Sequence, residues 1–194
     1  DEKLVHHHPH KIVDQFLIAH VNPAHQGGDF GLTTGMLATE IARMIHPGVE
    51  EKIRHFPAVS AVGDRSEAPE AALYIKLVED KYGREDLKKV ALALDYEAFW
   101  LRFNEGRGLI NDILCLGRLD RHRRIVDLLC EQANAAIDEQ LRASMGNVKS
   151  TKLPNGIIMN VLDVENFAHK FTFPPPGKTS GEVHDRLCKK FEGK

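Results

Sequence analysis

Apolar residues recur at helical spacing through most of the middle of this 194-residue chain, and this periodicity most limits the folds it can adopt. The pattern predicts helices over 32–45, 68–82, 87–101 and 120–145, each with one apolar face to bury. With 42% apolar and 28% charged residues, the chain has the composition of a soluble globular protein that can bury a core. A largely helical middle section is therefore expected.

Shorter apolar runs near the start favour extended backbone. Residues 3–5 and 17–21 are short apolar segments, and the second ends at the turn pair Asn22-Pro23. The small apolar residues of 56–63 predict a tightly packed strand that delivers Asp64 to its carboxyl end. Strands combined with the helices above predict an α/β fold with a parallel sheet.

A change of composition after Gly146 predicts a new domain. Residues 148–153 and 157–164 flank the turn Pro154-Asn155-Gly156, which is typical of a hairpin. A helix follows, with a capping box from Thr179 to Glu182 and an apolar face formed by Val183, Leu187 and Phe191. One hairpin and one helix bury little surface, so we expect the sequence to be a fragment of a longer protein.

Charge and cysteine content exclude several classes of protein. The net charge is −2, so nucleic-acid binding would need a local basic patch. The chain has no apolar run long enough for a membrane span and no secretory leader at its start, which predicts a cytoplasmic protein without a membrane partner. The three cysteines form no C-x-x-C pair, so we expect reduced thiols rather than disulfides or a zinc knuckle.

The densest chemical feature is a group of four histidines, His6, His7, His8 and His10, among eleven in the chain. Neutral imidazole binds manganese, iron and zinc, and a distant carboxylate such as Asp64 suits harder divalent ions. Two alternatives to a metal site are that the histidine run is the remnant of an affinity tag or that it is a solvated loop. Tags usually have consecutive histidines, whereas Pro9 interrupts this run.

The one dense basic patch lies at the amino end of the helix predicted over 120–145. It contains Arg118, Arg121, Arg123 and Arg124. These guanidinium groups could contact phosphates and release counterions. A solvated helix start, balanced by Asp120 and Asp127, is the equally favoured alternative.

Several segments, taken in order, resemble the DHH phosphoesterase family and specifically its archaeal RecJ-like nucleases. The matching segments are Val5-His6-His7-His8-Pro9, Val21-Asn22-Pro23 with Gly27-Gly28, Ala61-Val62-Gly63-Asp64, Leu109-Ile110-Asn111 with Gly117-Arg118-Leu119-Asp120, Asp163 to Phe167, and Phe173 to Thr179. The resemblance implies the later part of a DHH domain over 1–83, a helical connector over 84–146, and the beginning of a DHH-associated domain over 147–194.

The same resemblance implies a hydrolase of phosphodiesters in single-stranded DNA or RNA, an exonuclease that uses two manganese or magnesium ions. His7 and Asp64 would be metal ligands and His8 would lie beside the scissile phosphate. Asn111 and Arg118 would support the site or hold the nucleic-acid backbone, together with Arg121 and Arg124 of the basic patch. Replication proteins are further possible partners.

Two departures from the family pattern leave alternatives open. His6 stands where the motif has an aspartate, and the family's upstream aspartates and downstream glycine-rich loop are not in the sequence. This chain alone is therefore expected to have little or no activity. One alternative is a phosphodiesterase of the same family for short oligonucleotides or cyclic dinucleotides. The other is a non-catalytic scaffold that binds replication proteins.

Overall fold

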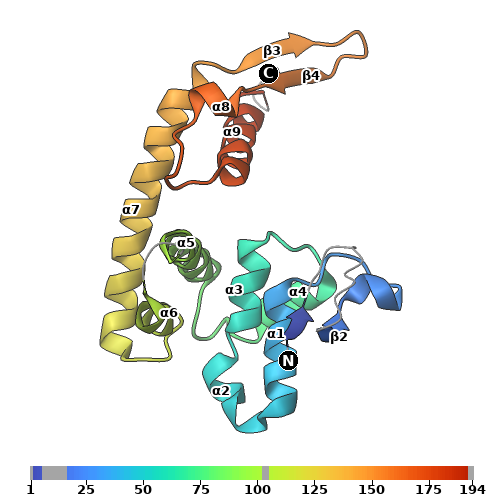
Figure 1. Cartoon of the computed structure of the whole chain (residues 1–194), viewed down its shortest axis with the longest axis vertical. Helices are drawn as coiled ribbons and strands as arrows, with labels where there is room; N and C mark the ends of the chain where they lie inside the picture. Colours follow the sequence, from blue (N-terminus) through green and yellow to red (C-terminus); the bar gives the residue numbers. More distant parts are fainter. Residues whose placement is uncertain (1, 6–16, 102–104, 192–194) are drawn as a thin grey trace. The chain divides into compact units, whose positions relative to one another are not determined.

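The computed structural model describes residues 2–5, 17–101 and 105–191, with side chains described for 21–101 and 105–190. The chain divides into two units, one formed by residues 1–94 and 106–126 and the other by 95–105 and 127–194. Helices α5 (Arg84–Trp100) and α7 (Leu119–Met145) contribute residues to both units (Figure 1). The domain boundaries expected at residues 83 and 146 stay a prediction.

The first unit begins with two parallel strands, β1 (Glu2–Val5) and β2 (Leu17–Val21). Val5 lies opposite Val21, so both strands end at the same edge of this small sheet. Both predicted strands and their parallel pairing are confirmed, which agrees with an α/β fold.

Short helical elements make up most of the first unit. They are η1 (Pro23–Gln26), α1 (Thr34–Ile45), η2 (Pro47–Val49), α2 (Glu50–Ile53), α3 (Phe56–Gly63), α4 (Pro69–Lys76) and α6 (Arg107–Ile113). Met36, Ala61 and Ala71 are each only 1% exposed and join α1, α3 and α4 in one core cluster. The helices predicted over 32–45, 87–101 and 120–145 are confirmed, whereas α4 is shorter than the predicted 68–82.

The strand predicted over 56–64 is wrong, because this segment is helix α3. A continuous apolar run has no period that separates a buried strand from a buried helix. Pro57 occupies the first turn of α3, where a missing amide donor has no cost, and alanine favours helix. Asp64 therefore follows the carboxyl end of a helix instead of a strand.

The second unit contains a hairpin and a helix beside the later part of α7. Strands β3 (Lys149–Lys152) and β4 (Ile158–Val161) pair antiparallel, as predicted, and α8 (Val164–Phe167) and α9 (Pro176–Phe191) follow. The capping box predicted from Thr179 is wrong, because α9 already begins at Pro176 and Thr179 lies inside it. The Thr179 hydroxyl donates to the carbonyl oxygen of Pro175, 3.2 Å away.

Buried aromatic and polar contacts hold the second unit together. Phe173 is 1% exposed, and its ring centroid lies 5.0 Å from that of Tyr96. The buried Gln140 side chain donates to Ser144 and accepts from the backbone amide of His169. No helix among the described residues is long and apolar enough to cross a membrane.

Candidate active-site pocket

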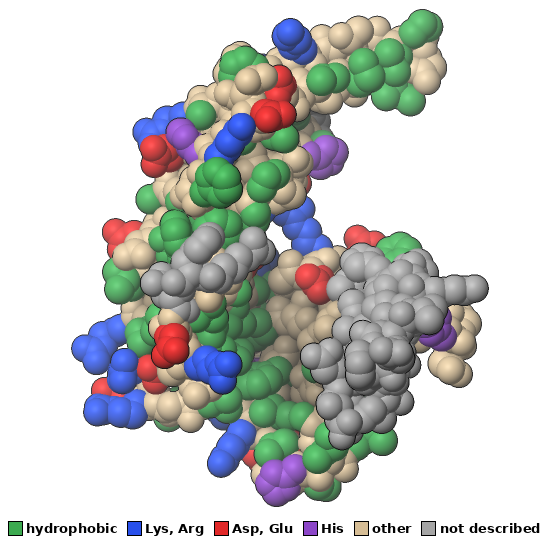
Figure 2. Space-filling view, in the orientation of Figure 1, with side chains coloured by type: hydrophobic (Ala, Val, Ile, Leu, Met, Phe, Trp, Pro, Cys, Tyr) green, Lys and Arg blue, Asp and Glu red, His purple; other side chains and the backbone are tan. Residues whose placement is uncertain are grey.

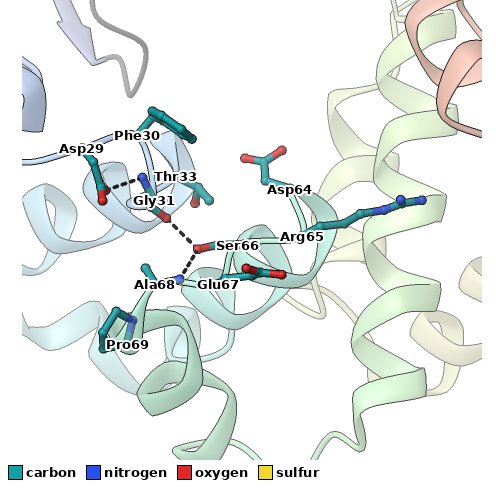
Figure 3. A pocket seen from close by; sticks show the side chains of 10 residues that line it. All are labelled: Asp29, Phe30, Gly31, Thr33, Asp64, Arg65, Ser66, Glu67, Ala68 and Pro69. Carbon is teal, nitrogen blue, oxygen red and sulfur yellow. Dashed lines mark hydrogen bonds between the residues drawn. The ribbon is translucent and has the colours of Figure 1, made fainter. Parts of the chain in front are cut away.

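Asp64 lines a pocket of about 640 Å³ in the first unit. Two loops line the pocket, one before α1 and one between α3 and α4 (Figure 3). Their residues are Asp29, Phe30, Gly31, Thr33, Asp64, Arg65, Ser66, Glu67, Ala68 and Pro69. The backbone amide of Asp64 donates to Ser60 at 3.0 Å, which fixes the start of its loop to the last turn of α3. The Asp64 side chain itself is exposed.

Ser66 ties the two loops to each other. Its hydroxyl donates to the carbonyl oxygen of Gly31 at 2.6 Å and accepts from the amide of Ala68 at 3.3 Å. A Cβ at Gly31 would stand 2.9 Å from Asp29 Oδ1 and 3.2 Å from Ala68 Cβ, so the loops approach too closely for a larger residue. The pocket wall is therefore a fixed arrangement of backbone.

Beside the pocket, helix α1 packs closely against α3 through Thr33, which lines the pocket, and Ser60. Thr33 is the N-cap residue of α1, and its buried hydroxyl accepts from the amide of Met36 at 3.3 Å. The same hydroxyl lies 2.6 Å from Ser60 Oγ on α3. A Cβ at Gly35 would collide with the side chain of Ser60, so only glycine permits this close packing.

Acidic groups predominate among the charged residues of the pocket. Asp29, Asp64 and Glu67 each contribute a carboxyl group to the lining. Asp29 Oδ1 accepts from the amide of Gly31 at 2.7 Å, which stabilises its own turn. The one basic residue in the lining, Arg65, has a left-handed backbone with φ of 53°, and its side chain points away from Asp64 (Figure 3).

The predicted metal ligands are only partly described. His7 and His8 lie outside the described residues, although β1 ends at Val5 directly before the histidine run. Among the described residues, no three histidine, cysteine, aspartate or glutamate side chains come together as a metal site. Asp64 is thus the one predicted ligand whose position is known, and the others stay predictions.

The residues predicted to bind nucleic acid do not line this pocket. Asn111 is exposed on α6, and the arginines lie before and within the first turns of α7. Figure 2 shows that basic and acidic side chains lie close together at this end of α7. Each of the three arginines named as contacts has an acidic partner within this part of the chain.

Asp112 and Asp120 supply these partners. Arg118 donates twice to Asp120, at 3.0 and 2.7 Å, and its guanidinium group lowers the pKa of that carboxyl group. Arg124 lies 3.8 Å from Asp120, and Arg121 lies 3.2 Å from Asp112. The two pairs of Asp120 are exposed, so each contributes little to stability and can exchange with solvent ions, whereas the Asp112 side chain is only 13% exposed.

Sequence reasoning identified Asp64 but missed the groups that surround it. Thr33, Ser66 and Glu67 were given no role, because hydroxyl and acidic residues in loops are common. The hydroxyl of Ser66, two residues after Asp64, could have been noted as a means of fixing the loop.

Comparison with known proteins gives one solved structure and one curated relative. The structure is described as the DHH domain of a member of a family of ribosomal proteins; it is 42% identical, with a TM-score of 0.87 over 97% of this chain. The uncharacterised protein MJ1198 of Methanocaldococcus jannaschii is 44% identical over 96% of this chain. The chain spans only 46% of the solved chain and 27% of MJ1198. No family model matches the sequence.

Proposed function

We propose that this chain, as a member of the DHH domain family, forms part of a phosphoesterase, specifically a RecJ-like hydrolase of phosphodiesters in single-stranded DNA or RNA. The observation that carries the proposal is the Asp64 pocket in a chain that is 42% identical to a DHH domain. The pocket presents an exposed carboxylate on a loop that hydrogen bonds and close packing fix in place.

The donor set fits a divalent metal only in part. Asp64 has the oxygen chemistry that manganese and magnesium accept, but the described residues provide too few neighbouring ligands for a complete site. His7 would be the second ligand, with His8 beside the phosphate. A bound metal ion would supply an acidified water and neutralise phosphate charge. The role of Thr33, Ser60 and Ser66 is to hold the loop that carries Asp64.

We place the nucleic-acid backbone against Asn111 and the arginines at the start of α7. Arg118, Arg121 and Arg124 are exposed and can form bidentate bonds to phosphate. Arg118 and Arg124 would exchange an exposed carboxylate partner, Asp120, for a phosphate, which has a small cost because surface ion pairs are weak. Binding should therefore be strongly dependent on salt concentration.

A manganese titration of the full-length parent protein with labelled single strands tests this function. We expect metal-dependent cleavage that His7→Ala and Asp64→Ala abolish. Asp80→Asn is the matched control, because Asp80 is exposed in the same unit and does not line the Asp64 pocket. Absence of cleavage with all upstream motifs intact would refute the nuclease. Cleavage that weakens as the strand lengthens would favour a phosphodiesterase for short oligonucleotides or cyclic dinucleotides.

One sequence observation favours a non-catalytic second function. His6 occupies the position of the motif's aspartate, so a scaffold that binds replication proteins is the alternative. Pull-down of such a partner by this chain, unchanged by His7→Ala and Asp64→Ala, would support the scaffold. Loss of the pull-down with either substitution would count against it.

A further inference from the structure

Two buried histidines contact one tyrosine in the first unit, away from the Asp64 pocket. His55 and His122 are each 7% exposed. The His55 ring stacks on Tyr82 with centroids 5.1 Å apart and planes 17° apart. The His122 ring meets the same tyrosine edge to face at 6.1 Å. The three rings join the N-cap position of α3, the segment after α4 and the start of α7.

Both imidazoles hold the carboxyl end of α6. His55 Nε2 lies 2.9 Å from the carbonyl oxygen of Leu114, and His122 Nδ1 lies 3.2 Å from that of Asp112. A carbonyl oxygen only accepts, so each ring donates an N–H here. The Asp112 carbonyl also accepts from the backbone amide of Cys115 at 3.2 Å, so His122 adds a second donor there, while His55 supplies a donor to the carbonyl that follows the helix.

The neighbouring charges oppose a proton on His55. Lys81 and His122 face the His55 ring. Arg123 and Asp86 act on Tyr82, whose hydroxyl is hydrogen-bonded to Cys115. The Asp112 carboxylate is already paired with Arg121 at 3.2 Å.

Burial lowers the pKa of His55. The bond to Leu114 acts in the opposite direction, and electrostatic repulsion from His122 and Lys81 adds to the lowering. His55 is therefore neutral in the closed arrangement at neutral pH.

We propose that His55, Tyr82 and His122 form an acid-sensitive clasp, which holds the carboxyl end of α6 less stably at acidic pH, because its buried rings leave no water around a charged imidazole. Opening the clasp exposes His55 to water, where it binds a proton below its ordinary pKa of about 6.5. The clasp is fully stable above that pH and weakens as the pH falls toward the lower pKa of the folded state. Opening releases residues 112–118, which include Arg118. Arg118 is one of the residues proposed above to contact nucleic acid, so an effect of the clasp on that binding, unlike the clasp itself, rests on the proposed function.

Hydrogen exchange of this 194-residue chain tests the clasp. Protection of peptides within 107–118, corrected for intrinsic exchange, should fall several fold from about pH 7.5 to about pH 5, because the pKa of His55 is lower in the closed arrangement than in the open one. His55→Gln keeps an amide donor for Leu114 but does not titrate, so its protection should not depend on pH. His46→Gln replaces an exposed histidine of the same unit and should behave like the unchanged chain.

Two results would overturn the clasp. One is the same pH dependence in His55→Gln and the unchanged chain; the other is a loss of protection spread evenly over the first unit. If His55→Gln does not fold, an NMR titration of the unchanged chain decides. The His55 ring and the Leu114 and Cys115 amides should then titrate together below about pH 6.5. Titration at or above that pH, or amides that do not move with the ring, would refute the proposal.

Discussion

The Asp64 pocket and the basic patch at the start of α7 differ in whether their charged side chains form ion pairs. In the patch, Arg118 and Arg121 have carboxylate partners at 2.7 and 3.2 Å. In the pocket, Asp64 has no ion pair with any described residue, and the hydrogen bonds around it fix backbone and hydroxyl groups. A carboxylate held on a fixed loop without a cation partner suits a ligand. Paired surface arginines suit exchange with a polyanion.

The largest expected difference between the two regions is in activity. In the full-length protein, Asp64→Asn should lower kcat/KM by at least about 100-fold, since outer partners of metal ligands alone contribute about 10–100-fold. Arg118→Gln should raise KM by only a few fold, because it removes one of several phosphate contacts. Steady-state kinetics with labelled single strands measures both. If both substitutions lowered kcat/KM by the same factor, the pocket and the patch would not differ in their roles in catalysis and binding.

The packing beside the pocket should be the next most sensitive feature. Gly35→Ala should destabilise the chain by about 1–3 kcal/mol, because the new Cβ collides with Ser60 on α3. Gly108→Ala is the control, since it adds a methyl group to helix α6 where nothing lies within 4 Å. It should stabilise the chain by up to about 1 kcal/mol. Denaturant unfolding gives both values. A neutral Gly35→Ala would mean that α1 and α3 do not pack this closely.

Loss of the bond between the two loops should have a smaller effect. Ser66→Ala removes the donor to Gly31 and should cost about 1 kcal/mol of unfolding free energy. Ser150→Ala removes an exposed bond to Asn160 in the hairpin and should cost less than about 0.5 kcal/mol. Thermal unfolding of both variants makes the comparison. The reverse order of effects would show that Ser66 does not tie the loops.

The smallest expected change concerns the balance of charge in the basic patch. Asp120→Asn removes the carboxylate partner of Arg118 and Arg124, so single strands should bind a few fold more tightly. Each extra phosphate contact should add about 0.7 to the slope of log affinity against log salt. Binding measured at several salt concentrations tests this. An unchanged slope would argue against phosphate contacts in the patch.

The pH dependence of the Asp120 ion pair has a defined sign. Arg118 lowers the pKa of Asp120 in the folded chain, so the pair stabilises the chain above the ordinary aspartate range. This contribution is lost as the pH falls through the lowered pKa. Asp120→Asn should abolish only the part of the unfolding free energy that depends on this ion pair at acidic pH. Unfolding measured at a series of acidic pH values detects that change.

Most elements with a clear period could be predicted from the sequence. The long helix ending at Met145 and the Asn155-Gly156 hairpin have local signals that need no partner, and both are confirmed. The segment 56–63 was assigned wrongly, because a fully apolar run fits either a strand or a helix between two others. The start of α9 was also misplaced, since Pro176 competes with Thr179 as a beginning.

The candidate site, like the fold, could be predicted from the sequence only in part. Asp64 could be selected from its motif, because chemistry follows residue type and order. The contacts that fix its loop could not, because Gly31 and Ser66 are 35 residues apart and Thr33 and Ser60 are 27 apart.

The amino-acid order alone determined the helical periods, the turn at Asn155-Gly156, the near-neutral charge and the set of residues able to bind metal or phosphate. These properties depend on each residue and its near neighbours. The tertiary structure decided that 56–63 is a helix, that Ser66 closes a loop onto Gly31, and that Arg118, Arg121 and Arg124 are paired. Such outcomes depend on packing and hydrogen bonds between distant segments, whose energies no local pattern contains.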